Sequence, residues 1–322
     1  MTREISPPPL KRRKLVSHDS EKKSPSFRVF SWNINGLKIK HGDSKTLAAF
    51  PMTINTPLNI SDILSEKRTY TLDTVLPRDK CNARGLQGKL YGVGPIIRKD
   101  FARNHAARIR EVDWDLEGQV SIVELTKGSA QDRPLALINI YAANGTSAPY
   151  RSPKTGKVVG TRYDHKIAFY SHLRDECLEL GAQGYNVVVA GDLNIARGVL
   201  DGYPNLRTYP NQHCLNRTEF NAKLLGKVDN KRAKAYVTAN SEKEVCLDAV
   251  DVVRALRGSE RRYTYHLRTT RRGNSCDRVD LILASKRFWG QGHILATGIL
   301  DSPQERGPSD HVPLWVELKG PG

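Results

Sequence analysis

The stretch Val187-Val188-Val189-Ala190-Gly191-Asp192-Leu193-Asn194 decides how this chain is expected to fold. Its four consecutive apolar residues indicate a central strand covered on both faces, because a half-exposed strand would alternate apolar and polar residues. The run leads directly into Asp192 and Asn194, so two polar side chains are expected at the edge of a sheet. Asp and Asn beside Gly are also ordinary turn residues, and this motif alone is more often a turn than a site.

Six other short runs, rich in β-branched and aromatic residues, indicate further strands, several with the alternation typical of half-buried antiparallel strands. These runs are Phe27–Trp32, Tyr91–Ile97, Val120–Leu125, Leu135–Tyr141, Val279–Ala284 and Val312–Leu318. One helix is predicted from Asp164 to about Leu180, with Asp164 as its N-cap and Gly181 at its end. Strands with interspersed helices favour an α/β fold of two sheets packed face to face, with helices outside.

Residues 39–80 fit this pattern least well. They contain Pro51, Pro57 and Pro77, and no apolar run as strand-like as the others. Proline interrupts the hydrogen bonding of an interior strand, so no strong strand is predicted here.

Composition limits the class of protein. With 322 residues, 39% hydrophobic and 26% charged, the chain can bury a sizeable core. No apolar run approaches the roughly 18–20 residues of a membrane-spanning helix, so no membrane association is expected. Five cysteines without CxxC spacing argue against a disulfide framework and a structural zinc site, and favour a reducing intracellular compartment.

The formal net charge of +17 is concentrated in three segments. Residues 1–24 carry +4, residues 78–110 carry +7 and residues 254–272 carry +6. We interpret residues 1–25 as a disordered basic tail, followed by one domain over residues 26–319. Within the tail, Lys11-Arg12-Arg13-Lys14 is typical of a nuclear import signal, which predicts the nucleus as location. The two interior basic stretches are expected to track a polyanion and to flank the functional site, although a solvated surface would give the same pattern.

Polar residues follow or precede several of the predicted strands. The motifs are SWNING at 31–36, YAAN at 141–144, GDLN at 191–194, DRVD at 277–280 and SDH at 309–311. Each has an ordinary structural explanation when taken alone: Tyr141 as a core aromatic, Asp280 as a partner of Arg278, and His311 as a buried histidine. Their joint occurrence in this order is more specific than any one of them.

Together with EG at 117–118, this ordered set resembles the exonuclease III / apurinic-apyrimidinic endonuclease group of the endonuclease/exonuclease/phosphatase superfamily. The resemblance covers roughly residues 27–318. It implies a deoxyribonuclease I-like four-layer α/β sandwich, with two mixed β-sheets packed face to face and helices outside. It also implies a Mg²⁺-dependent phosphodiesterase that acts on DNA as an abasic-site endonuclease or 3′-exonuclease in repair. We expect the chain to be a monomer.

The resemblance assigns residue roles by motif. Catalytic roles are implied for Tyr141, Asp192, Asn194, Asp280 and His311, and substrate binding for Asn144 and Arg278. Metal binding, by Mg²⁺ or alternatively Mn²⁺, is implied for Asn33, Asp192, Asn194, Asp310 and His311. Asp280 would orient His311 through an imidazole–carboxylate hydrogen bond. Clustered Asp and Asn oxygens suit a hard cation that also binds phosphate oxygens.

Three positions depart from the group's pattern. A strand ending in Gln-Glu, whose glutamate is a metal ligand, is expected between residues 37 and 91 and is missing; Glu66 is the nearest candidate. Gln119 stands where a basic residue is usual, and Asp277 where abasic-site endonucleases tend to place an aromatic, although Tyr265 could still form a wall of that pocket.

Two alternatives therefore stay open. One is a nucleic-acid-binding homologue that has lost catalysis together with the Gln-Glu motif. The other is a phosphatase of the same fold that acts on phosphoinositides or another small phosphoester.

Overall fold

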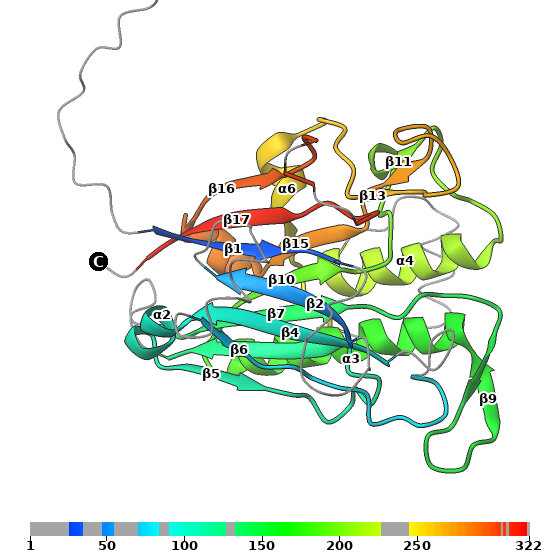
Figure 1. Ribbon diagram of the computed structural model, residues 1–322, viewed down its shortest axis with the longest axis horizontal. Coiled ribbons are helices and arrows are strands. Elements are labelled where there is room, and N and C mark those ends of the chain that lie inside the picture. Colours follow the sequence, from blue (N-terminus) through cyan, green and yellow to red (C-terminus); the bar gives the residue numbers. More distant parts are fainter. Residues whose placement is uncertain are drawn as a thin grey trace, which may run out of the picture.

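The computed structural model describes residues 26–34, 47–54, 70–83, 90–126, 133–226, 245–303, 305–306 and 309–320. Two six-stranded sheets dominate it, and both mix parallel and antiparallel pairs (Figure 1). The basic tail and Glu66 lie outside the described residues.

The first sheet has the spatial order β16-β17-β1-β2-β4-β3. Its strands are β16 (Ile294–Ile299), β17 (Leu314–Lys319), β1 (Ser26–Ser31), β2 (Leu47–Ile54), β4 (Leu90–Arg98) and β3 (Tyr70–Leu72). Strand β1 is antiparallel to both of its neighbours, and β2 runs parallel to β4.

The second sheet has the spatial order β12-β15-β10-β7-β6-β5. Its strands are β12 (Val250–Asp251), β15 (Asp280–Ala284), β10 (Asn186–Asp192), β7 (Leu135–Tyr141), β6 (Val120–Leu125) and β5 (Ala107–Arg110). All residues of β10 are buried, as expected for a central strand covered on both faces.

Small sheets and helices complete the described part. The small sheets are β11 (Gly202–Tyr203), β14 (Cys276–Asp277) and β13 (Tyr265–His266), and the hairpin β8 (Pro149–Arg151) with β9 (Val158–Thr161). The helices are α2 (Lys99–Asn104), α3 (Arg162–Ala182), α4 (Gln212–Leu225), α6 (Val252–Arg257) and α7 (Lys286–Gly290), with a 3₁₀ turn η3 at Val199–Asp201. No helix in these described ranges is long and apolar enough to span a bilayer.

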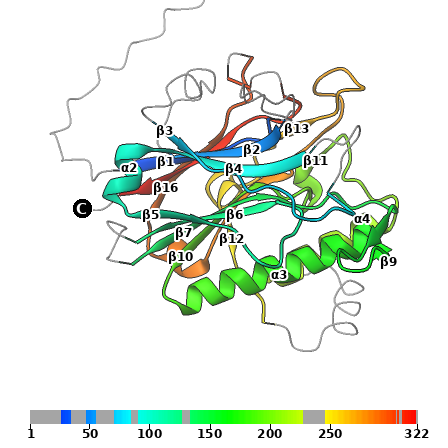
Figure 2. The ribbon, with the colours of Figure 1, turned by 60° about the horizontal axis from the view of Figure 1, so that its bottom comes forward.

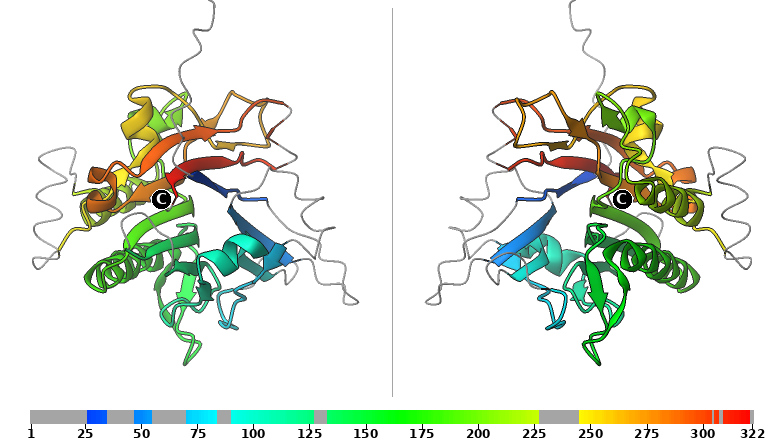
Figure 3. Two further views of the ribbon diagram at one scale, coloured as in Figure 1. Left: turned by 90° about the vertical axis from the view of Figure 1, so that its left-hand side faces the viewer. Right: turned by 90° about the vertical axis from the view of Figure 1, so that its right-hand side faces the viewer.

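Two layers of apolar side chains hold the sandwich together. Between the sheets, Val29 of β1 and Val316 of β17 belong to one buried cluster with Val188 and Ala190 of β10. On the other face of the second sheet, alternate residues of β7 and β10 form a cluster with α3 and α4. Figure 2 shows α3 along the outside of this sheet, and Figure 3 shows the two sheets in layers. The α/β sandwich with two mixed sheets face to face is therefore confirmed.

All seven predicted strands are present, two with the predicted bounds and the others with ends shifted by one or two residues. The predicted helix starts and ends differently. Thr161 is its N-cap, and its side chain accepts a hydrogen bond from the backbone N–H of Asp164, whose own carboxylate accepts the backbone N–H of Thr161. Asp164 is thus the third residue of a capping box rather than the cap. The helix also continues past Gly181 to Ala182.

Strand β2 corrects the weak prediction for residues 39–80. Its sequence LAAFPMTI lies between β1 and β4, with Pro51 in the middle of an interior strand. This strand contains no carboxylate, and its register pairs Ser31 with Met52 and Val29 with Ile54. Because β1 runs towards Asn33, β2 runs away from it.

Candidate active site

A cavity of about 320 Å³ opens where the central strands of both sheets end. Seven of the nine residues to which the sequence resemblance assigns a role line it: Asn33, Tyr141, Asn144, Asp192, Asn194, Asp310 and His311. Asp280 lies fully buried behind this lining, and Arg278 lies elsewhere.

Strand register brings three of these residues into one row. Asp192 at the end of β10 is the cross-strand partner of Asp280 at the start of β15 and of Tyr141 at the end of β7. Cross-strand partners point to the same face of a sheet. Two and four residues further into β10 on this face are Ala190 and Val188, which belong to the core between the sheets. The apolar layer therefore ends in a polar row that faces the cavity.

Gly191 is required at this strand end. Its φ is 151°, and a Cβ added there would overlap with the backbone carbonyl of Ile140 on β7. A side chain would push β10 and β7 apart directly beside Asp192 and Tyr141.

His311 is anchored through the first sheet. The Ser309 hydroxyl donates to the backbone carbonyl of Asn33 at 2.7 Å and accepts the backbone N–H of His311 at 3.1 Å. The indole N–H of Trp32 donates to the carbonyl of His311 at 3.1 Å. These bonds tie the segment before β17 to the end of β1, so two distant parts of the chain place one imidazole.

The imidazole of His311 lies between two carboxylates. Its Nδ1 is 2.8 Å from Oδ2 of Asp280, and its Nε2 is 3.8 Å from Oδ2 of Asp192. Burial alone would lower the pKa of His311, but the charges of Asp280 and Asp192 outweigh it and raise the pKa to about 9. Burial, with the nearby charge of Asp280, raises the pKa of Asp192 to about 6. At neutral pH the raised pKa of His311 favours the protonated ring, which lies between the side chains of Asp280 and Asp192.

Hydrogen bonds fix the loop from Asp192 to Asn194. The Oδ1 of Asp192 accepts the backbone N–H of Asn194 at 2.8 Å, and its Oδ2 accepts Nδ2 of Asn33 at 3.0 Å. Asn194 has a left-handed φ of 51°, and its Nδ2 donates to the carbonyl of Ala142 at 2.7 Å. Asparagine tolerates this conformation better than most residues, which explains its place in the motif.

Helix α3 holds the same loop from behind. Lys166 donates from Nζ to the carbonyl of Asn194 at 2.6 Å, and Tyr170 donates from its hydroxyl to the carbonyl of Leu193 at 2.8 Å. These donors are four positions apart and so share one face of the helix. Burial lowers the pKa of Lys166 to about 7, against the opposing effect of Asp192. Lys166 is not among the residues expected from sequence; its only signal is that a lysine stands among the core-facing residues of the predicted helix.

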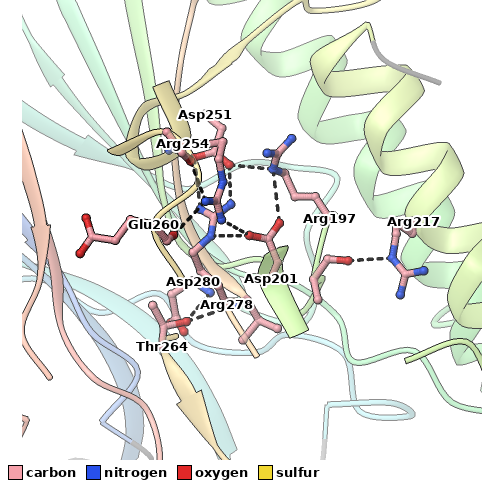
Figure 4. Close-up of polar contacts among 12 residues, drawn as sticks. Arg197, Asp201, Arg217, Asp251, Arg254, Glu260, Thr264, Arg278 and Asp280 are labelled. Atoms are coloured by element: carbon pink, nitrogen blue, oxygen red, sulfur yellow. Dashed lines mark hydrogen bonds and ion pairs between the residues drawn. The ribbon is translucent and has the colours of Figure 1, made fainter. Parts of the chain in front are cut away.

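The expected substrate-binding role of Arg278 is wrong on geometric grounds. Its side chain is completely buried, with Nε 2.8 Å from Asp201 and a terminal nitrogen 2.7 Å from Asp251. Arg197 and Arg254 pair with the same two carboxylates (Figure 4). Arg278 therefore contributes to a buried ion network instead of facing substrate.

Asp280 does not pair with Arg278, the ordinary structural role considered for it from sequence. Asp280 pairs with His311, and the hydroxyl of Thr264 accepts its backbone N–H at 3.0 Å (Figure 4). The Oδ1 of Asp280 is buried and has no hydrogen-bond partner among the described residues.

The two interior basic stretches behave differently. Arg268, from the second stretch, pairs with Asp310 at 3.2 Å on the cavity rim. The first stretch is expected at the same place, and this is wrong for its part from Arg98 to Arg103, which ends β4 and continues into α2. Ile97 pairs with Ile54 and Ile54 with Val29, so β4 ends beside the start of β1, away from Asn33. Helix α2 lies at that end of the molecule (Figure 1).

The structure also places Gln119 and Asp277, the two other residues that differ from the motif pattern of the resembled group. Gln119 is buried and outside the cavity, where its carbonyl accepts the backbone N–H of Tyr141 at 2.9 Å. Asp277 and Tyr265 both line the cavity. Asp277 pairs with Arg207 at 3.4 Å, and the ring centroid of Tyr265 lies 5.0 Å from that of His311.

The donor set fits a divalent cation. Asp192, Asp280 and His311 place their potential ligand atoms within 4.8 Å of one another, and the two carboxylates are the donors when the imidazole is protonated. Carboxylate oxygens, including the unpartnered Oδ1 of Asp280, are the ligands that hard cations prefer. Asp192 and His311 belong both to this cluster and to the set expected from sequence, which adds Asn33, Asn194 and Asp310 from the same cavity.

No protein-family model matches the sequence, and no curated protein matches it. Among solved structures, the chain is similar to the catalytic domain of Xenopus laevis APE2, with 20% identity and a TM-score of 0.45 over 64% of this chain. The aligned part spans only 57% of that structure. The 3′ phosphatase NExo from Neisseria, bound to a product DNA hairpin, has 17% identity and a TM-score of 0.49, over 80% of this chain and 92% of that one. An AP endonuclease from Archaeoglobus fulgidus has 15% identity and a TM-score of 0.43, over 80% and 92%.

Proposed function

We propose that the chain is a divalent-metal-dependent phosphodiesterase that acts on DNA, of the abasic-site endonuclease or 3′-exonuclease type, and that it works in repair in the nucleus. The observation that carries this proposal is the arrangement of His311 between Asp280 and Asp192 at the end of the central strands. It supplies both a fixed positive charge and a carboxylate beside it in a polar cavity.

The residues suit hydrolysis of a phosphodiester. The oxygen of a water forms a bond to phosphorus, and the bond from phosphorus to the leaving oxygen breaks. Asp192, whose pKa is raised to about 6 mainly by burial, takes the proton of the attacking water, and the leaving oxygen takes a proton from solvent. The imidazolium of His311, held by Asp280, stabilises charge on the phosphoryl oxygens.

Polar groups on the same cavity position the phosphate. Tyr141, Asn144 and Asn194 line it on the side formed by the second sheet. A divalent cation such as Mg²⁺, when bound, would neutralise phosphoryl oxygens; Asn33, Asp192 and Asp310 are the groups that would hold it.

The test is a nuclease assay with the full-length chain on three labelled duplexes: one with an abasic site, one nicked and one undamaged. We expect cleavage that requires Mg²⁺ or Mn²⁺ and stops with EDTA. His311→Ala and Asp192→Ala should each abolish most of it, whereas Arg103→Gln, an exposed change on α2, should not. Activity that survives both active-site substitutions would overturn the proposed mechanism.

One observation favours a second candidate, a nucleic-acid-binding protein without turnover. The strand between β1 and β4 carries no glutamate and runs away from Asn33, so it supplies no metal ligand at the cavity. This candidate predicts salt-dependent DNA binding with no cleavage in either metal. Metal-dependent turnover by the recombinant chain would exclude it.

A further inference from the structure

The cavity has a second side that the proposed chemistry does not use. Lys166 of α3, Arg207 of the loop between β11 and α4, and His213 and Arg217 of α4 all line it. We call these four residues the basic wall. None belongs to a motif singled out in the sequence, and they come from three separate elements.

The basic wall is rigidly built. Arg217 donates from Nε to the carbonyl of Ala196 at 2.7 Å and from a terminal nitrogen to the carbonyl of Arg207 at 2.7 Å (Figure 4 shows the first). Lys166 is bound to the carbonyl of Asn194. These bonds fix both cations and the loop that carries Arg207, so the wall is formed before any ligand arrives.

The four groups act on one another electrostatically. Burial lowers the pKa of His213, and the charges of Arg207, Lys166 and Arg217 lower it further. The lowered pKa leaves His213 mostly uncharged at neutral pH, so the positive charge of the wall comes mainly from Arg207 and Arg217, which an anion would complement.

Arg207 is the member best placed to meet that anion. Its side chain is 52% exposed, and its ion pair with Asp277 is long, at 3.4 Å. A planar guanidinium binds phosphate through two parallel hydrogen bonds.

We propose that the basic wall binds a second phosphate group of the nucleic-acid substrate, next to the phosphate that faces Asp192 and His311, with Arg207 as its main ligand. This rests on the proposed function, because it assumes a nucleic-acid strand in the cavity. The second phosphate is either the neighbouring backbone phosphate or a terminal phosphate, and both have the same chemistry.

The first experiment measures binding in EDTA, so that it needs no turnover. The dissociation constant for an abasic-site duplex is followed as a function of salt for the wild type, Arg207→Gln and the matched control Arg103→Gln on α2. Loss of one phosphate contact should reduce the slope of log K against log salt by about 0.9. We expect this reduction for Arg207→Gln and none for the control. Equal slopes for all three proteins would overturn the proposal.

Substrate changes distinguish the two sources of the phosphate. A neutral methylphosphonate is placed on either side of the abasic site, and a separate duplex carries a 3′-phosphate or a 3′-hydroxyl end. The wild type should bind about tenfold less tightly when the recognised phosphate is removed, and Arg207→Gln should show no such preference. Arg207→Lys, which keeps the charge, should restore part of it. If Arg207→Gln keeps every preference of the wild type, the wall is not a phosphate site.

Failure of this inference and failure of the proposed function give different results. Loss of the salt-slope effect with intact metal-dependent cleavage rejects the basic wall alone. An intact salt-slope effect without cleavage in Mg²⁺ or Mn²⁺ rejects the proposed catalysis and keeps the phosphate site.

Discussion

His311 and Asp280 form a hydrogen-bonded pair of 2.8 Å in which both side chains are buried, at the point where the core between the two sheets reaches the cavity. The pair leaves Nε2 of the imidazole on the side of Asp192. Asp280 therefore determines both the orientation and the charge of the ring.

Replacing Asp280 by Asn should separate these two effects. The amide keeps the shape but removes the charge that raises the pKa of His311, so we expect that pKa to fall. Turnover should drop by about 10–100-fold, as for other residues that orient a histidine. NMR titration of the ring and the pH profile of kcat check both points. Asp175→Asn, an exposed change on α3, is the control; an unchanged histidine pKa in Asp280→Asn would contradict the assignment.

The same histidine should make folding stability depend on pH. Its pKa is about 9 in the folded chain against 6.5 ordinarily, so the folded state binds the proton more tightly. This stabilisation is fully present below pH 6.5 and is lost as the pH rises through 9. In urea unfolding without metal, the stability advantage of wild type over His311→Gln should shrink between these values. An advantage independent of pH would show that the raised pKa is not real.

Lys166 and Tyr170 offer a matched comparison. Each donates to one of two consecutive carbonyls, of Asn194 and Leu193. Lys166→Met and Tyr170→Phe should each cost about 1–3 kcal/mol of folding free energy, because a buried acceptor loses its donor. Only Lys166→Met also removes an amine that carries positive charge beside Asp192 below its pKa of about 7, so at pH 6 its kcat should fall further than that of Tyr170→Phe. Equal losses of kcat at equal stability would argue that Lys166 acts only as a structural donor.

Arg278 should behave as a structural residue. Arg278→Met leaves Asp201 and Asp251 without the cation between them, and removing one partner of a buried ion pair typically costs about 3–5 kcal/mol. We expect a lower midpoint of urea unfolding and an unchanged KM for DNA in the fraction that remains folded. A raised KM with unchanged stability would instead support the substrate-binding role implied by sequence.

Metal binding can be measured without activity. If Asp192 is a ligand, Mg²⁺ should raise the Tm of the wild type by favouring the folded state, and EDTA should reverse the rise. Asp192→Asn should lose most of this shift, because it removes a charged ligand from the cluster. Calorimetric titration with Mg²⁺ gives a second readout. The same Tm shift in both proteins would remove Asp192 from the metal site.

Most strands of the two sheets can be predicted from short runs of the sequence. Strands such as Val120–Leu125 and Leu135–Tyr141 appear with the predicted bounds, because apolar and β-branched runs favour a pleated, buried surface wherever they occur. Strand β2 is not predicted, since Pro51 lowers its strand propensity and its pairing with β1 and β4 depends on residues distant in the sequence.

The candidate site also has a part that the sequence predicts and a part that only the structure shows. The sequence by itself determined that Asp192, Asp280 and His311 stand at the ends of apolar strands, because a change from apolar to polar residues is a local signal. Tertiary structure alone decided the partners. One of the two carboxylates that pair with Arg278 lies 77 positions away at Asp201, and the residues of the basic wall come from three elements. Charge–charge attraction depends on the distance between two groups in space, which cannot be read from their separation in the sequence.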